Sequence, residues 1–141
     1  MGDLKLTYQV DGGDLVQAGE ASSQMKMTLK KLGLPPEIIR KASVCMYEGE
    51  INMVIHADGG EAEVEVDMDR IVLRMTDTGP GIPDVEQAMQ EGYSTAGPTA
   101  RELGFGAGMG LPNMKRYSDE MTIETEVGKG TVVTVVIKIP Q

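Results

Sequence analysis

The segment that most constrains this chain is Asp77–Ile82, which reads Asp-Thr-Gly-Pro-Gly-Ile and follows an alternating apolar run, Arg70–Thr76. That run predicts a buried strand, so its end places the Asp77 carboxylate at the edge of a sheet. The neighbouring Gly79 and Gly81 allow positive φ angles and let a planar ligand lie close to the main chain. A carboxylate there accepts a hydrogen bond from an exocyclic amine such as N6 of adenine. The alternative is a strand followed by an ordinary Gly-Pro turn, because strand-to-turn signals of this kind are common.

Two polar side chains upstream form a second candidate feature. Glu48 and Asn52 are four residues apart in a helical pattern, so they share one face of the helix. An amide oxygen suits Mg²⁺, which takes few protein ligands and keeps waters and phosphate oxygens. A carboxylate one turn away can accept a proton from an attacking hydroxyl or water. The alternative is a solvated helix face, on which Glu and Asn are ordinary residues.

A glycine-rich run downstream forms a third feature. Glycine stands at every second position from Gly104 to Gly110, and a predicted helix begins at Leu111. Backbone N–H groups that lead into a helix N-terminus form an anion site. By composition alone, a flexible loop is an equal alternative.

A fourth feature, Gly128–Thr131, completes an ordered set that resembles the nucleotide site of the Bergerat-fold ATPases. This superfamily includes gyrase B subunits, sensor histidine kinases and bacterial anti-sigma kinases. The resemblance covers roughly residues 37–139. Each motif is weak by itself, whereas the four in this order and spacing are specific.

The resemblance implies a role for each matching residue. Glu48 would be the catalytic base, Asn52 would hold Mg²⁺, and Asp77 would bind adenine with help from Thr131. A β-branched residue that opens a strand needs no such role, so for Thr131 both interpretations stay open. Glu50 would then be a bystander. The remaining expected ATP contacts are Gly79, Gly81, Ile82, Gly106, Gly108, Met109 and Gly110.

Within the superfamily, several segments look closest to the anti-sigma serine/threonine kinases, and in particular to the switch kinase of the bacterial stress-signalling module. They are Gln90–Thr95, Leu111-Pro112, Lys115-Arg116 and Asp119-Glu120. The insert Ala96–Phe105 is longer than in that kinase, and it lies in the lid that closes over the nucleotide.

Three functions follow from the resemblance. The first is a kinase that phosphorylates a serine or threonine of a small antagonist protein of the sulfate-transporter-and-anti-sigma-antagonist type. The second is a non-catalytic, nucleotide-gated module that sequesters a sigma factor or another regulator. The third is an ATPase subunit of a larger assembly. A homodimer is left open.

The pattern of elements predicts an α+β two-layer sandwich, with a mixed, mostly antiparallel sheet and helices on one face. We expect one domain over residues 1–141, with an ATP lid at about 91–108 that is mobile without nucleotide and has Phe105 as its apolar latch. Strands are predicted at Leu4–Val10, Ala62–Met68, Arg70–Thr76, Met121–Glu126 and Thr131–Ile139. Helices are predicted at Leu15–Leu32, Pro36–Ala57, Pro83–Gln90 and Leu111–Glu120.

Composition narrows the classes of function. The net charge of −9 argues against nucleic-acid binding, which depends on neutralisation of phosphates by Lys and Arg. No apolar run approaches the roughly 18 residues of a membrane span, and the N-terminus does not read as a secretory signal. The single cysteine, Cys45, excludes an internal disulfide and is expected to pack in the core. Together, these points favour the cytoplasm. With no tryptophan and one phenylalanine, the 11 methionines are expected to fill the core.

Overall fold

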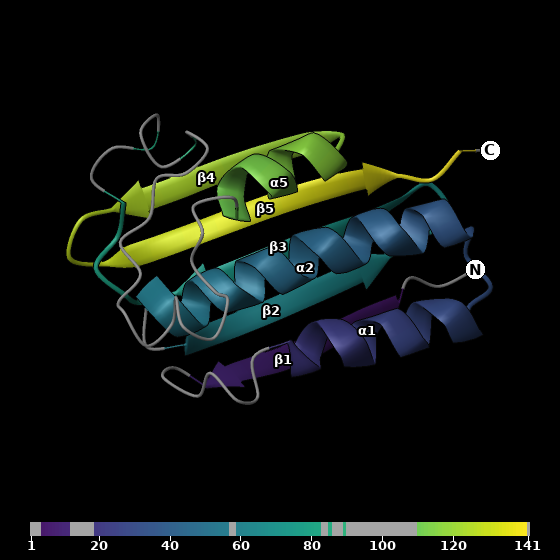
Figure 1. Ribbon diagram of the computed structural model, residues 1–141, viewed down its shortest axis with the longest axis horizontal. Helices are drawn as coiled ribbons and strands as arrows, with labels where there is room; N and C mark the ends of the chain where they lie inside the picture. Colours follow the sequence, from purple (N-terminus) through teal and green to yellow (C-terminus); the bar gives the residue numbers. More distant parts are fainter. Residues whose placement is uncertain are drawn as a thin grey trace.

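In the part of the chain that the computed structural model describes, five strands form one sheet, and three helices cover one of its faces (Figure 1). The structure describes residues 4–11, 19–56, 59–82, 85, 89 and 110–140. The strands lie in the order β1-β2-β3-β5-β4. Their bounds are β1 (Leu4–Asp11), β2 (Gly59–Val66), β3 (Arg70–Asp77), β4 (Glu120–Glu126) and β5 (Gly130–Lys138).

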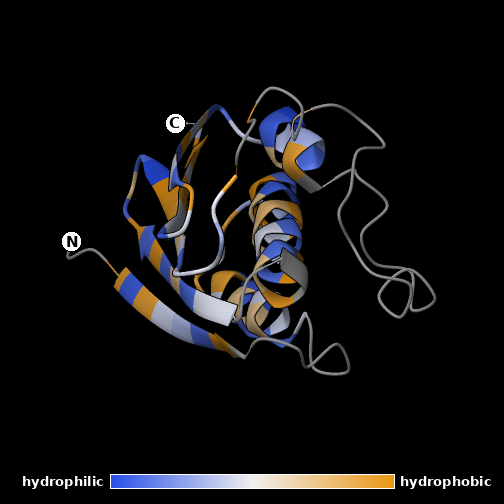
Figure 2. Ribbon diagram, turned by 90° about the vertical axis from the view of Figure 1, so that its left-hand side faces the viewer, coloured by the Kyte–Doolittle hydropathy of each residue, from blue (hydrophilic) through white to orange (hydrophobic). Residues whose placement is uncertain are grey.

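The predicted two-layer α+β architecture is confirmed, with one refinement to the sheet. All four ladders between the described strands are antiparallel, so these strands have no parallel component. The β2–β3 and β4–β5 hairpins form as predicted because each alternating pair is joined by a short turn. Figure 2 shows the sheet and the helices as two separate layers.

The helices are α1 (Glu20–Lys31), α2 (Pro36–His56) and α5 (Gly110–Tyr117). The prediction that the first helix starts at Leu15 is wrong, because Gly19 is its N-cap and has a left-handed φ of 100°. A side chain at Gly19 would also come within 3.0 Å of the Tyr47 ring. Residues 12–18 lie outside the described part of the chain.

Glu50 anchors the beginning of α1, a structural role that the sequence pattern did not predict. Its side chain is 3% exposed, and its two carboxylate oxygens accept the backbone N–H groups of Ala21 and Ser22, each at 3.1 Å. These are two of the N–H groups that a helix N-terminus leaves without intrahelical partners. A buried carboxylate on α2 therefore caps a helix that lies nearly 30 residues earlier in the chain.

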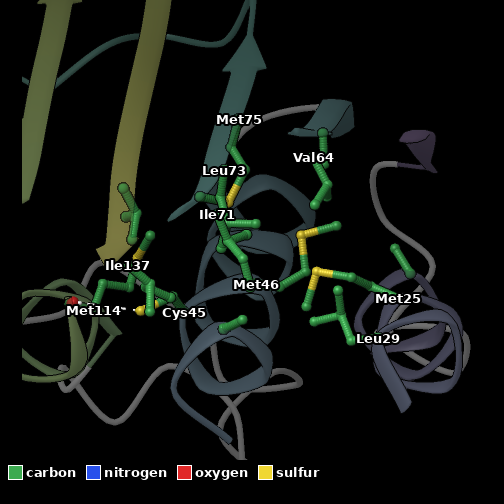
Figure 3. Packing of buried hydrophobic residues seen from close by; sticks show 14 of the residues in the cluster. Met25, Leu29, Cys45, Met46, Val64, Ile71, Leu73, Met75, Met114 and Ile137 are labelled. Atoms are coloured by element: carbon green, nitrogen blue, oxygen red, sulfur yellow. Dashed lines mark hydrogen bonds between the residues drawn. The ribbon is translucent and has the colours of Figure 1, made fainter. Parts of the chain in front are cut away.

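Methionines fill much of the space between the two layers, as predicted (Figure 3). The buried ones are Met25, Met46, Met53, Met75 and Met114. Cys45 is also fully buried, and its Sγ donates a hydrogen bond to the Met114 carbonyl at 3.5 Å. Burial raises the pKa of the Cys45 thiol to about 12, so it stays protonated and acts as a small apolar residue, as expected.

Most of the predicted helix Pro83–Gln90 and all of the predicted lid, with Phe105, lie outside the described residues. Of that helix, Val85 and Met89 are described, and the Met89 N–H donates to the Val85 carbonyl at 3.0 Å. In the part of the chain that the structure describes, no helix is long and apolar enough to cross a membrane.

Candidate functional site

Three polar side chains form a row across one end of the sheet. Asp77 is the last residue of β3, and it lies directly opposite Thr131 on β5. Thr131 in turn lies opposite Thr125 on β4. Directly opposed residues of antiparallel strands point to the same face, so the row shares a face with the buried Met75 and Val135, which is the face that the helices cover.

The Asp77 carboxylate is half-buried and oriented by its own turn. Its Oδ1 accepts the Gly79 backbone N–H at 2.9 Å, as in an Asx-turn. Among the described residues, no hydrogen bond reaches Oδ2. The predicted position of Asp77, at the end of a buried strand beside glycines, agrees with the structure.

Two turns hold each other at this end of the sheet. The Gly128 N–H donates to the Pro80 carbonyl at 2.8 Å, and the Ile82 N–H donates to Thr125 Oγ1 at 2.9 Å. A side chain on Gly81 would come within 2.6 Å of the Glu126 carbonyl. Gly81 therefore has a packing role within the chain itself, besides the ligand contact that the sequence predicts for it.

Gly130 lets β5 approach the end of β3. Its φ is 136°, and a Cβ at this position would collide with the backbone of Asp77 and Thr78. Thr131 is consequently held beside Asp77 and is only 7% exposed. Sequence reasoning included Gly130 in a turn and missed Thr125, whose only signal is the strand alternation that places it opposite Thr131.

Glu48 is half-buried on α2, and removal from water raises the pKa of its carboxyl group. A hydrogen bond with the Asn113 side chain has the opposite, smaller effect on this pKa. A carboxylate whose pKa lies above the usual range is a stronger proton acceptor. Asn113 lies on α5, and sequence reasoning missed it because no local pattern links it to a residue 65 positions earlier.

The middle of α2 lies closely over the end of β3. A Cβ on Gly49 would collide with Met75 Sδ and would lie 3.3 Å from the Met114 terminal methyl. One turn later, Met53 lies against Gly60, which also contacts the Thr76 carbonyl. Tight packing against Met75 and Met114 thus explains why position 49 is a glycine. Glu48 and the half-buried Asn52 directly precede Gly49 and Met53 on this part of α2.

The chemistry of these side chains fits a magnesium nucleotide. The row with Asp77 offers oxygen acceptors for the amine of a base. The amide oxygen of Asn52 suits a hard cation, and the carboxylate of Glu48 suits the proton of a reacting hydroxyl. Gly110 is the first residue of α5, while Gly106, Gly108 and Met109 lie outside the described residues. Within the described ranges, no group of three or more His, Cys, Asp or Glu side chains is placed to hold a metal ion.

The profile of the "Histidine kinase-, DNA gyrase B-, and HSP90-like ATPase" family matches residues 44–141, which include every predicted site residue. Serine/threonine-protein kinase RsbT of Bacillus subtilis is 32% identical over 106 residues, which are 72% of this chain and 74% of that protein. The anti-sigma F factor of Pasteuria penetrans is 36% identical over 99 residues, 65% of this chain and 63% of that one.

A solved structure supports the fold. The mycobacterial sensor histidine kinase MprB superposes with a TM-score of 0.55 at 14% identity, and the match covers 96% of this chain and 98% of that one. At this identity the likeness concerns the fold alone, and it agrees with the predicted architecture. The chain belongs to the family of histidine kinase-, DNA gyrase B- and HSP90-like ATPases, and its relatives support the anti-sigma kinase branch of that family.

Proposed function

We propose that this protein is an ATP-dependent serine/threonine protein kinase that phosphorylates a small antagonist protein of the anti-sigma-antagonist type. The observation that carries the proposal is the half-buried Glu48, with its raised pKa, on a helix that lies over the end of the Asp77 strand. A proton acceptor and an amine-binding row at the same end of the sheet are what phosphoryl transfer from ATP to a hydroxyl needs. The names of the two relatives, a serine/threonine kinase and an anti-sigma factor, support the same reaction class.

Each residue has a role in the proposed transfer. The substrate hydroxyl oxygen bonds to the γ-phosphorus, the bond from the γ-phosphorus to the β–γ bridging oxygen breaks, and ADP leaves. Glu48 accepts the hydroxyl proton, and Asp77 with Thr131 holds the adenine. Asn52 would hold Mg²⁺, which neutralises phosphate charge when bound. The phosphates would contact Gly106, Gly108, Met109 and Gly110 at the end of a lid over residues 91–108.

The proposal places the protein in the cytoplasm, where ATP and a regulatory partner meet. A direct test incubates the protein with Mg²⁺, ATP labelled at the γ-phosphate and candidate antagonist domains. We expect label on a serine or threonine of one such domain. If ATP binds and no candidate becomes labelled, while a sigma factor binds in a nucleotide-dependent way, the protein is a binding module instead.

Asp77→Asn should weaken ATP binding by about 1–3 kcal/mol, the cost of a mispaired buried polar group. The amide can still accept the Gly79 N–H through Oδ1, but it presents an NH₂ group where the adenine amine needs an acceptor. Asp67→Asn is the matched control. Asp67 accepts the N–H groups of Asp69 and Arg70 in the turn at the far end of β3. Replacing its carboxylate should therefore leave ATP affinity unchanged. Calorimetry that finds equal affinity for Asp77→Asn and the parent removes Asp77 from the site.

Asn52→Ala should abolish the part of ATP affinity that depends on Mg²⁺ and leave the fold intact. The reason is that the amide oxygen would be a direct ligand of the ion. The measurement is ATP titration with Mg²⁺ and with EDTA, and Ser43→Ala on the same helix serves as control. If Mg²⁺ strengthens ATP binding equally in Asn52→Ala and in the parent, Asn52 is not the ligand.

A further inference from the structure

Thr125 lies at the centre of a small hydrogen-bond network beside the proposed adenine site. Its Oγ1 is 3.1 Å from the Gly130 carbonyl, 2.9 Å from Thr131 Oγ1 and 2.9 Å from the Ile82 backbone nitrogen. Two of these groups belong to the first residues of β5, and the third belongs to the turn after Asp77. Thr125 therefore connects β4 to the strand opposite Asp77 and to the turn that follows Asp77.

The positions of the hydrogens in this network follow from counting donors. A threonine hydroxyl has one hydrogen and two lone pairs. The Gly130 carbonyl can only accept, so Thr125 must use its hydrogen there. The Ile82 N–H can only donate, so it occupies one lone pair of Thr125. In the contact between the two threonines, Thr131 is then the donor, and all three contacts are satisfied at once.

This assignment determines what Thr131 can offer to a ligand. Its only hydroxyl hydrogen points to Thr125, which leaves the oxygen with acceptor positions alone. Thr131 lies directly opposite Asp77, whose carboxylate is an acceptor when ionised. The end of the sheet thus presents two acceptors side by side. An exocyclic amine, which has two hydrogens, suits such a pair, whereas a carbonyl oxygen is repelled by both.

We propose that Thr125 is a positioning residue that holds the Thr131 hydroxyl as an acceptor and thereby makes the site select 6-amino over 6-oxo purine nucleotides. This inference rests on the proposed function, because it assumes that the base lies at Asp77. It goes further in assigning part of the selectivity to a residue that does not touch the nucleotide.

The test compares the affinities of ATP and inosine triphosphate, which differ only in the base and carry an amine or an oxygen at its position 6. Both are titrated into the parent, Thr125→Val and Thr122→Val. Thr122 lies on the same strand, is exposed and belongs to the opposite face, so Thr122→Val controls for the loss of a threonine from β4. We expect the parent and this control to prefer ATP by the same factor.

In Thr125→Val, the Thr131 hydroxyl is released and can donate to a 6-oxo group. The preference for ATP over inosine triphosphate should then fall by about tenfold, the effect of one mispaired hydrogen bond. The preference that is left should be due to Asp77. Thr125→Ser keeps the hydroxyl and should restore the parental preference. A merely structural role would weaken both nucleotides equally, and this result would overturn the inference. Thr125→Ala provides a second hydroxyl-free variant if the valine protein does not fold.

The outcomes separate this inference from the proposed function. The readout is binding, so a protein that binds ATP and transfers no phosphate would contradict the kinase and leave the preference measurable. A parent that binds inosine triphosphate as well as ATP would overturn the inference directly. A parent that binds neither would overturn both.

Discussion

Glu48→Gln should lower phosphotransfer by about 10²–10⁴-fold, the usual contribution of general-base catalysis, while ATP binds almost as tightly as in the parent. Glutamine nearly preserves the size of the side chain and can still form a hydrogen bond with Asn113. It cannot accept a proton from the substrate hydroxyl. The chemistry is therefore lost, while the surroundings of α2 and α5 change little.

The measurement is single-turnover transfer from labelled ATP, together with calorimetry of ATP binding. Glu37→Gln is the matched control, because Glu37 lies in the first turn of the same helix, is exposed and pairs with Lys41. Equal rates for Glu48→Gln and the parent would mean that Glu48 is not the base. A loss of ATP affinity as large as the loss of rate would make Glu48 a binding residue instead.

The pH dependence of the parent rate follows from the same carboxyl group. The base must be ionised, and desolvation raises the pKa of Glu48 above its ordinary value. As the pH falls, the rate should therefore decline at a higher pH than it would for a solvent-exposed glutamate. This acid limb should be missing from the residual activity of Glu48→Gln.

Gly130→Ala should destabilise the protein by about 2–6 kcal/mol and also weaken ATP binding. A side chain at φ 136° is strained by about 1–3 kcal/mol, and its Cβ collides with the backbone of Asp77 and Thr78. Relieving this overlap in a packed region costs a further 1–3 kcal/mol or so. The shift moves Asp77 away from Thr131, so the two groups that would hold the base separate.

Gly128→Ala separates the effect of backbone strain from the effect of the collision with Asp77 and Thr78. Gly128 also has a left-handed φ, 84°, but a Cβ there would meet nothing within 4 Å. Its replacement should cost only about 1–2 kcal/mol of conformational strain and leave ATP affinity unchanged. Urea unfolding and ATP titration of both variants are the measurements. If the two variants lose the same stability and the same ATP affinity, the contact between Gly130 and the end of β3 does not contribute to ATP binding.

The local sequence pattern was sufficient to predict most of the helices and strands that the structure describes. Alternation between apolar and polar residues located all five strands, and helical periodicity located α2 and the start of α5 within a residue or two. The candidate site residues Glu48, Asn52, Asp77 and Thr131 were found for a related reason. Each belongs to a short motif in which spacing along the chain determines which face of an element a side chain occupies.

Other features depend on contacts between residues far apart in sequence, and only the tertiary structure decided them. The first helix begins at Glu20 because Glu50, on another helix, accepts two of its N–H groups. Glu48 has a raised pKa because packing removes its carboxyl group from water, and this effect exceeds that of the opposing hydrogen bond with Asn113. Thr125 gained a role because the register of three strands places it in one row with Thr131 and Asp77. The local sequence determined which helices and strands form. The packing of these elements against one another determined how far each site residue is removed from water and which hydrogen bonds it makes.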